Sequence, residues 1–102
     1  MSTVVARFED LADGAATAVT VGKRALVLVR LGDEVYCLDD RCSHENFPLS
    51  SGEVIGSLCE IECDRHGATF RLADGSPCSL PATKPVPTHV VRIVDGNVEV
   101  DL

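Results

Sequence analysis

The sequence contains no tryptophan and has few aromatic residues of any kind. Three Phe and one Tyr make up 4% of the 102 residues, although 45% of the residues are hydrophobic. We therefore expect a core of Val, Leu, Ile and Ala. At about 100 residues, folding removes roughly two-thirds of the unfolded chain's surface from water, so this core must be small. The length predicts a single domain over residues 1–102, which a bound inorganic centre would help to stabilise.

Basic residues are also scarce. Nine Lys and Arg stand against 16 Asp and Glu, which gives a formal net charge of −7. This balance argues against nucleic acid as a partner, because phosphates require a basic face. It also argues against binding to anionic membrane surfaces. An acidic protein of this kind is suited to docking on positively charged partners.

Long apolar runs are missing as well. The longest run near the start covers residues 25–29, far short of the roughly 20 residues that cross a bilayer. Residues 1–10 carry charges and lack the apolar region of a signal peptide. We therefore expect no membrane association and a cytoplasmic location. In that compartment five cysteines, an odd number, do not indicate a disulfide framework.

Short β-branched runs separated by turn residues predict an all-β protein. Gly32 and Asp33 mark one hairpin turn, and Asp95 to Asn97 mark another. Eight or nine short strands with no helical periodicity are typical of a β-sandwich or barrel. The predicted strands are 4–8, 17–21, 25–30, 34–38, 58–62, 68–72, 89–94 and 98–102, with a turn or one helical turn at 9–14.

Two stretches are predicted to be loops. Residues 39–52 are polar and contain Pro48, and residues 76–87 contain four prolines. Proline is not found inside central strands because it cannot donate to the ladder. Loops this long in a small domain usually carry function.

Two Cys–His pairs are the candidate chemistry of the chain. Cys42 and His44 lie in the first loop, and Cys63 and His66, followed by Gly67, come after an interval of 18 residues between His44 and Cys63. Tetrahedral zinc is one possible centre, although zinc sites usually pair Cys with Cys and His with His. One Cys and one His on each turn suits a two-iron centre, in which one iron takes both thiolates and the other both imidazoles.

This pattern resembles the signature of Rieske-type [2Fe–2S] proteins, and the likeness extends over nearly the whole chain. Residues 47–54 are similar to the loop between the ligand turns of bacterial Rieske ferredoxins, and residues 80–86 to the proline loop that closes over the cluster. The interval of 18 residues between His44 and Cys63 is slightly longer than usual for the family. We expect the extra length near residues 56–59, at a hairpin tip where insertions cost little.

The resemblance implies a fold and a ligand set. The fold is the all-β Rieske (ISP-domain) fold, with an antiparallel β-sandwich or barrel base formed by the two chain ends and a cluster-binding subdomain inserted at about residues 39–87. The cofactor is a Rieske-type [2Fe–2S] cluster. Its metal ligands are Cys42, His44, Cys63 and His66, and the resemblance implies no catalytic residue.

The residues around the second ligand turn predict a low reduction potential. High-potential members of the family have Ser directly after the second turn's Gly and Tyr two residues beyond, where this chain has Ala68 and Phe70. Hydrogen bonds to the cluster sulfurs raise the potential. High-potential members also carry a disulfide between the turns, whose positions are Phe47 and Asp64 here.

We therefore expect a one-electron carrier, not an enzyme. It would pass electrons from a flavoprotein ferredoxin reductase to a terminal oxygenase or related redox enzyme. The alternative is an accessory subunit or redox sensor of a nitrite reductase or of an iron–sulfur assembly system, which keeps its cluster without turnover.

The other cysteines and His89 are expected to have structural roles. We expect Cys37 to act as a small buried apolar residue and His89 to be a half-exposed strand residue. Cys59 and Cys78 flank the predicted cluster region, where they could pack beneath it or form a disulfide. Three basic residues could rim a docking face or be solvated charges: Arg41, Arg65 and Lys84.

Overall fold

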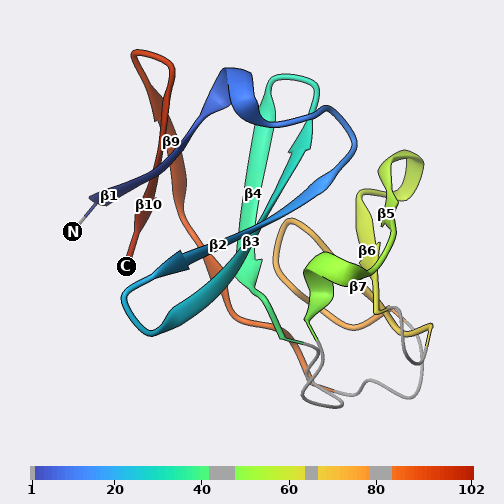
Figure 1. Cartoon of the computed structure of the whole chain (residues 1–102). Coiled ribbons are helices and arrows are strands. Elements are labelled where there is room, and N and C mark those ends of the chain that lie inside the picture. Colours follow the sequence, from blue (N-terminus) through green and yellow to red (C-terminus); the bar gives the residue numbers. More distant parts are fainter. Residues whose placement is uncertain (1, 42–47, 64–66, 79–83) are drawn as a thin grey trace.

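The computed structural model describes residues 2–41, 48–63, 67–78 and 84–102. Within these ranges the chain forms ten short strands in three antiparallel sheets and no α-helix (Figure 1). None of the described segments is a helix with the length and apolar character needed to span a bilayer. The strands are β1 (Ser2–Arg7), β2 (Ala16–Val21), β3 (Arg24–Leu31), β4 (Glu34–Asp39), β5 (Val54–Ile55), β6 (Glu60–Glu62), β7 (Thr69–Arg71), β8 (Thr88–His89), β9 (Val91–Val94) and β10 (Asn97–Asp101).

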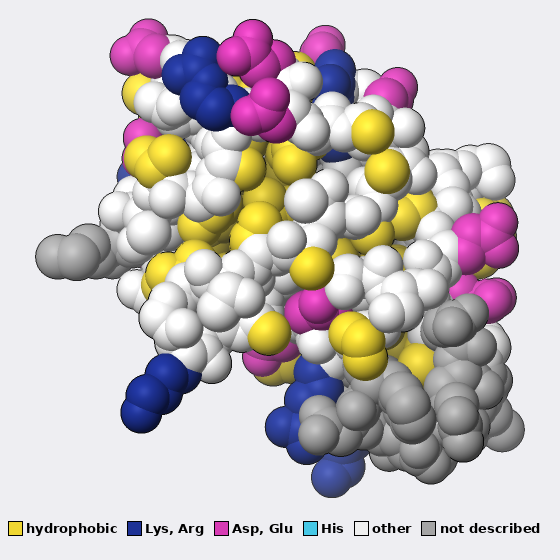
Figure 2. All heavy atoms as spheres, in the orientation of Figure 1, with side chains coloured by type: hydrophobic (Ala, Val, Ile, Leu, Met, Phe, Trp, Pro, Cys, Tyr) yellow, Lys and Arg dark blue, Asp and Glu magenta, His cyan; other side chains and the backbone are white. Residues whose placement is uncertain are grey.

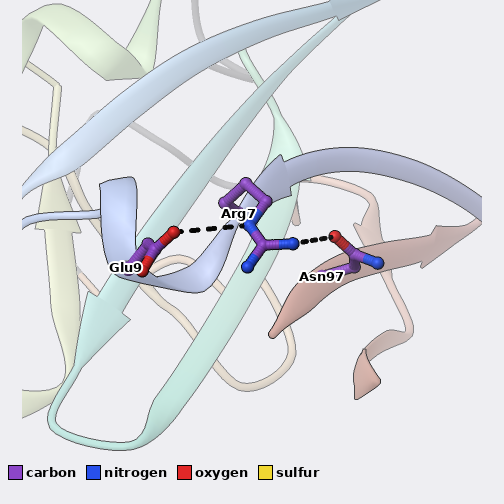
Figure 3. A network of polar contacts seen from close by, with 3 residues as sticks. All are labelled: Arg7, Glu9 and Asn97. Atoms are coloured by element: carbon purple, nitrogen blue, oxygen red, sulfur yellow. Dashed lines mark hydrogen bonds and ion pairs between the residues drawn. The ribbon is translucent and has the colours of Figure 1, made fainter. Parts of the chain in front are cut away.

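The first sheet joins the two ends of the chain in the order β1-β10-β9. The β9–β10 hairpin turns through Asp95 and Gly96, which both have positive φ (52° and 78°), as a two-residue turn of the I′ type requires. Arg7 at the end of β1 donates to Asn97 Oδ1 at 3.1 Å and lies 3.5 Å from the Glu9 carboxylate (Figure 3). These exposed contacts connect β1, the 3-10 turn η1 (Phe8–Asp10) and β10.

The second sheet, β2-β3-β4-β8, lies between the other two (Figure 1). Its strand β3 is buried on both faces, and Leu26, Val27, Leu28 and Val29 have no exposed surface. Leu26 and Leu28 pack with Val98 and Val100 of the first sheet. Val27 and Val29 pack on the opposite face, in the core that includes the third sheet. The continuous apolar run thus reflects a strand between two cores.

The third sheet, β5-β6-β7, is built around the cross-strand pair Ile61 and Phe70, both fully buried. Leu49, in the 3-10 turn η2 (Leu49–Ser51), packs in the same core. A further 3-10 turn, η3 (Gly56–Leu58), joins β5 to β6. Residues 56–59 therefore lie at a hairpin tip, as predicted.

The prediction of one strand at 89–94 is wrong. Two strands lie there: β8 pairs with β4 in the second sheet, and β9 pairs with β10 in the first. Val90 lies between them and is 60% exposed. The β-branched residues Thr88, Val90 and Val91 continue across the boundary without a turn residue, so the sequence does not reveal the change of sheet. The two-residue strand β5 was also not predicted, because it is too short to show alternation.

Two glycines allow close backbone contacts at the ends of the predicted loops. A Cβ atom at Gly52 would overlap the carbonyl oxygen of Glu62, and a Cβ atom at Gly75 would overlap that of Val86. Gly75 also has a left-handed backbone (φ +74°). Loop 39–52 is thereby packed against β6, and the start of loop 76–87 against its own end.

We predict that Gly52→Ala lowers the free energy of unfolding by about 1–3 kcal/mol or more, because an added methyl group forces the two backbones apart. Gly56→Ala is the matched control, since the nearest atom to its Cβ is Leu31 Cδ2 at 3.5 Å. Urea unfolding followed by circular dichroism measures both variants. Equal effects would show that the close approach at Gly52 is not a constraint.

Candidate metal centre

Of the four predicted ligands, the structure describes Cys63. It follows β6 directly, has no exposed surface, and packs among Leu49, Ala68 and Phe70. Cys42, His44 and His66 lie outside the described residues. A thiolate buried in an apolar cluster is shielded from water, which is the environment a stable iron–thiolate bond needs.

The turn after Cys63 is closed by two backbone hydrogen bonds. The Cys63 N–H donates to the Ala68 carbonyl at 2.7 Å, and the Gly67 N–H donates to the Cys63 carbonyl at 2.9 Å. Gly67 has φ +68°, a left-handed conformation that favours glycine. The turn that contains His66 in the sequence is therefore attached at both ends to the β6–β7 hairpin.

Asp40 and Ser50 close the first predicted ligand loop. The Ser50 N–H donates to Asp40 Oδ1 at 2.7 Å, and the Ser50 hydroxyl donates to Oδ2 at 2.6 Å. Asp40 in turn donates its backbone N–H to the Ala25 carbonyl at 3.0 Å. The backbone of Asp40 thus attaches the start of the segment that contains Cys42 and His44 to β3, and its partly buried carboxylate attaches the end of that segment to its start. This contact cannot be predicted from the sequence, because an Asp and a Ser ten residues apart form no recognisable motif.

Asp39 connects the same loop to the proline-rich one. Its N–H donates to the Pro87 carbonyl at 2.9 Å, and its carbonyl accepts from the Arg41 N–H at 2.8 Å. Its carboxylate lies 2.7 Å from His89 Nε2. His89 lies in β8, which confirms the predicted strand, but its side chain is only 10% exposed, so the prediction of a half-exposed residue is wrong.

The described ends of loop 76–87 are attached to the sheets as well. Val86 is 1% exposed and donates its N–H to the Gly75 carbonyl at 2.9 Å. Cys78 donates its N–H to the Thr69 carbonyl of β7 at 2.8 Å. Each segment that carries a predicted ligand or the proline motif therefore starts and ends on a hydrogen-bonded strand or turn.

Within the described ranges, no three His, Cys, Asp or Glu residues lie close enough together to hold a metal ion. A centre built from the described residues alone is thus not supported. The buried thiol of Cys63 and its closed turn do fit a cluster that takes one of its ligands from this hairpin. Two thiolates and two imidazoles are the donor set of a Rieske centre.

The remaining described cysteines are free thiols outside the predicted ligand set, and Cys59 packs against the core that contains Cys63. Cys37 is 2% exposed, and burial raises the pKa of its thiol to about 12, so it stays a protonated, unreactive side chain. The prediction of a small buried apolar residue is confirmed. Cys59 and Cys78 are both free thiols, so the disulfide considered for them is absent.

Comparisons with known proteins agree with this architecture. Residues 1–90 match the Rieske [2Fe-2S] domain. The anthranilate 1,2-dioxygenase ferredoxin subunit of Burkholderia cepacia is 33% identical over 94 residues, which cover 92% of this chain and 85% of that protein.

Two solved structures are similar throughout. The ferredoxin of carbazole 1,9a-dioxygenase from Nocardioides aromaticivorans IC177 has a TM-score of 0.95 and 32% identity, and the match covers 98% of this chain and 96% of that one. A chain in the complex of reduced oxygenase and oxidized ferredoxin in carbazole 1,9a-dioxygenase has a TM-score of 0.90 and 34% identity, covering 97% and 91%.

The chain therefore belongs to the Rieske [2Fe–2S] domain family. The predicted all-β Rieske fold and [2Fe–2S] cofactor are confirmed. The expectation of an electron carrier rather than an enzyme is confirmed as well. The assignment of the four individual ligands stays a prediction.

We predict that Asp40→Ala speeds the loss of iron to a chelator by roughly tenfold or more. Hydrogen bonds to charged groups contribute about 1.5–3 kcal/mol, and about 1.4 kcal/mol corresponds to a tenfold change. Visible absorbance of the holoprotein during incubation with EDTA gives the rate.

Asp74→Ala is the matched control. The Asp74 carboxylate also accepts the N–H and hydroxyl of a serine, Ser76, but it closes only a local exposed turn. We expect its rate of iron loss to stay within about twofold of the wild-type rate, since the lost hydrogen bonds lie outside the ligand loop. Similar rates in the two variants would mean that Asp40 does not hold the ligand loop in place.

Proposed function

We propose that this protein is the ferredoxin component of a dioxygenase system, located in the cytoplasm. It accepts one electron from a flavoprotein reductase and delivers it to a terminal oxygenase. The observation that carries the proposal is a likeness to oxygenase-system ferredoxins along almost the full length of both chains, at 32–34% identity.

The proposed ligands divide between two turns. Cys42 and Cys63 supply the thiolates, and His44 and His66 supply imidazole nitrogens, all from a cluster-binding subdomain at about residues 39–87. When bound, the [2Fe–2S] cluster supplies a one-electron couple. Cys63 keeps its sulfur in the apolar core. In this proposal electrons enter and leave the cluster past the two imidazole rings.

Side chains next to Cys63 support a low potential. Ala68 and Phe70 are both fully buried in the same core as Cys63, and neither carries a hydroxyl group. A buried hydroxyl at either position would have few acceptors other than the cluster sulfurs and the backbone. These two described positions therefore provide no side-chain donor to stabilise the added negative charge of the reduced form.

We predict that Ala68→Ser or Phe70→Tyr raises the reduction potential. A hydrogen bond that favours the reduced form by about 0.5–1.5 kcal/mol corresponds to a rise of roughly 20–65 mV, since 59 mV is a tenfold change for one electron. Protein-film voltammetry measures the shift. An unchanged potential in both variants would remove this explanation of the low potential.

Metal and sulfide analysis of the purified protein tests the proposed centre. We expect equimolar iron and acid-labile sulfide, and an EPR signal of low average g after reduction with dithionite.

We predict that Cys63→Ser abolishes the cluster, because it removes a thiolate ligand, whereas Cys37→Ala keeps it, because Cys37 is a buried thiol outside the ligand turns. One zinc per chain, or a cluster retained by Cys63→Ser, would contradict the proposal.

Stopped-flow reduction distinguishes the carrier from an accessory subunit or redox sensor. A carrier must be reduced by a flavoprotein reductase and reoxidised by an oxygenase at rates compatible with turnover. Reduction far slower than turnover would instead favour a subunit that keeps its cluster for structure or sensing.

A further inference from the structure

A hollow with two arginines lies beside the first predicted ligand loop. Its volume is about 260 Å³, and the described residues that line it are Arg24, Ala25, Asp39, Asp40 and Arg41. Arg24 begins β3, and Arg41 follows the end of β4. Figure 2 shows one group of Lys and Arg side chains at the lower edge of the molecule, below a few acidic side chains, and other basic side chains at the upper edge, among acidic ones.

Among the described residues, the two arginine side chains have unpaired N–H donors, whereas the two carboxylates already form hydrogen bonds. Arg24 and Arg41 are exposed, and neither side chain forms a hydrogen bond or ion pair with any residue that the structure describes. The Asp39 carboxylate is bonded to His89 and the Asp40 carboxylate to Ser50. Each guanidinium presents five N–H donors in a planar fork that matches a carboxylate.

The hollow lies next to the segment that contains two of the predicted cluster ligands. Arg41 directly precedes Cys42 in the sequence, and its backbone is held by the hydrogen bond from its N–H to the Asp39 carbonyl, at 2.8 Å. A group bound between the arginines therefore lies against the root of the loop that carries two predicted ligands. A contact at this place would orient a redox partner toward the centre.

We propose that Arg24 and Arg41 form a docking contact that accepts an exposed Asp or Glu side chain of the redox partner. This inference rests on the proposed function. The chain has a net charge of −7 and repels anions at long range. The two arginines thus form one site on an acidic ferredoxin at which an acidic patch of its partner can bind. Binding at this one site would fix the orientation of the two proteins in the complex.

The test uses ferricyanide as an anionic oxidant of the dithionite-reduced holoprotein. One electron passes from the protein to ferricyanide, whose iron goes from Fe(III) to Fe(II), and no bond is formed or broken. Stopped-flow absorbance gives the second-order rate constant at an ionic strength of about 20 mM, where screening is weak. Hexaammineruthenium(III), a cation, is the second oxidant and reports whether electron transfer as such is intact.

The variants are Arg24→Glu, Arg41→Glu and the control Arg92→Glu. Arg92 is exposed on β9, in the sheet of the chain ends. All three substitutions change the net charge from −7 by the same amount, so only the position of the charge differs. We expect Arg24→Glu and Arg41→Glu to slow oxidation by ferricyanide roughly fivefold or more, and Arg92→Glu by much less, because the interaction of charges falls with distance.

A tetra-aspartate peptide supplies the carboxylate probe. We expect it to slow the ferricyanide reaction of the wild type and of Arg92→Glu, and to leave that of Arg41→Glu unchanged. Hexaammineruthenium(III) must still oxidise every variant for the comparison to apply. Given that, equal slowing of the ferricyanide reaction by all three charge reversals, or no slowing of it by the peptide, would overturn the docking contact. If neither oxidant removes an electron, the proposed electron carrier itself fails.

Discussion

The whole structure depends on the burial of β3 on both faces. Leu26 and Leu28 complete the core shared with the sheet of the chain ends, while Val27 and Val29 complete the core shared with the small sheet that contains Cys63. A chain of this size has little apolar surface to bury. Because one strand contributes side chains to two cores, each core is large enough to stabilise its sheet. The same strand holds the small sheet that contains Cys63 against the sheet of the chain ends.

Loops that bind a metal have little core of their own, so their ends must be held by other means. Backbone hydrogen bonds close the turn after Cys63 and the proline-rich loop, and the carboxylate of Asp40 closes the loop before Ser50. Every attachment leads back to β3, β4, β6 or β7 or to the turns next to them. The sheets therefore hold the ends of the segments that contain the predicted ligands.

The sequence predicted the parts of this structure that depend on local patterns. Short runs rich in β-branched and apolar residues located β2, β3 and β4, and the turn of Asp95 and Gly96 located the last hairpin, because both signals lie within a few residues. The two Cys–His pairs indicated the family for the same reason. The change of sheet at Val90, the two-residue strand β5 and the Asp40–Ser50 contact depend on which distant segments meet. No local pattern records that information.

Charge illustrates the same difference between composition and position. The composition describes an acidic protein suited to basic partners. Yet β3 begins with an arginine and β4 is followed by one, and the fold places both beside a single hollow whose acids are bonded elsewhere. At physiological ionic strength the net charge is screened beyond about 8 Å. For a docked partner the local arrangement of side chains therefore matters more than the net charge of the whole chain.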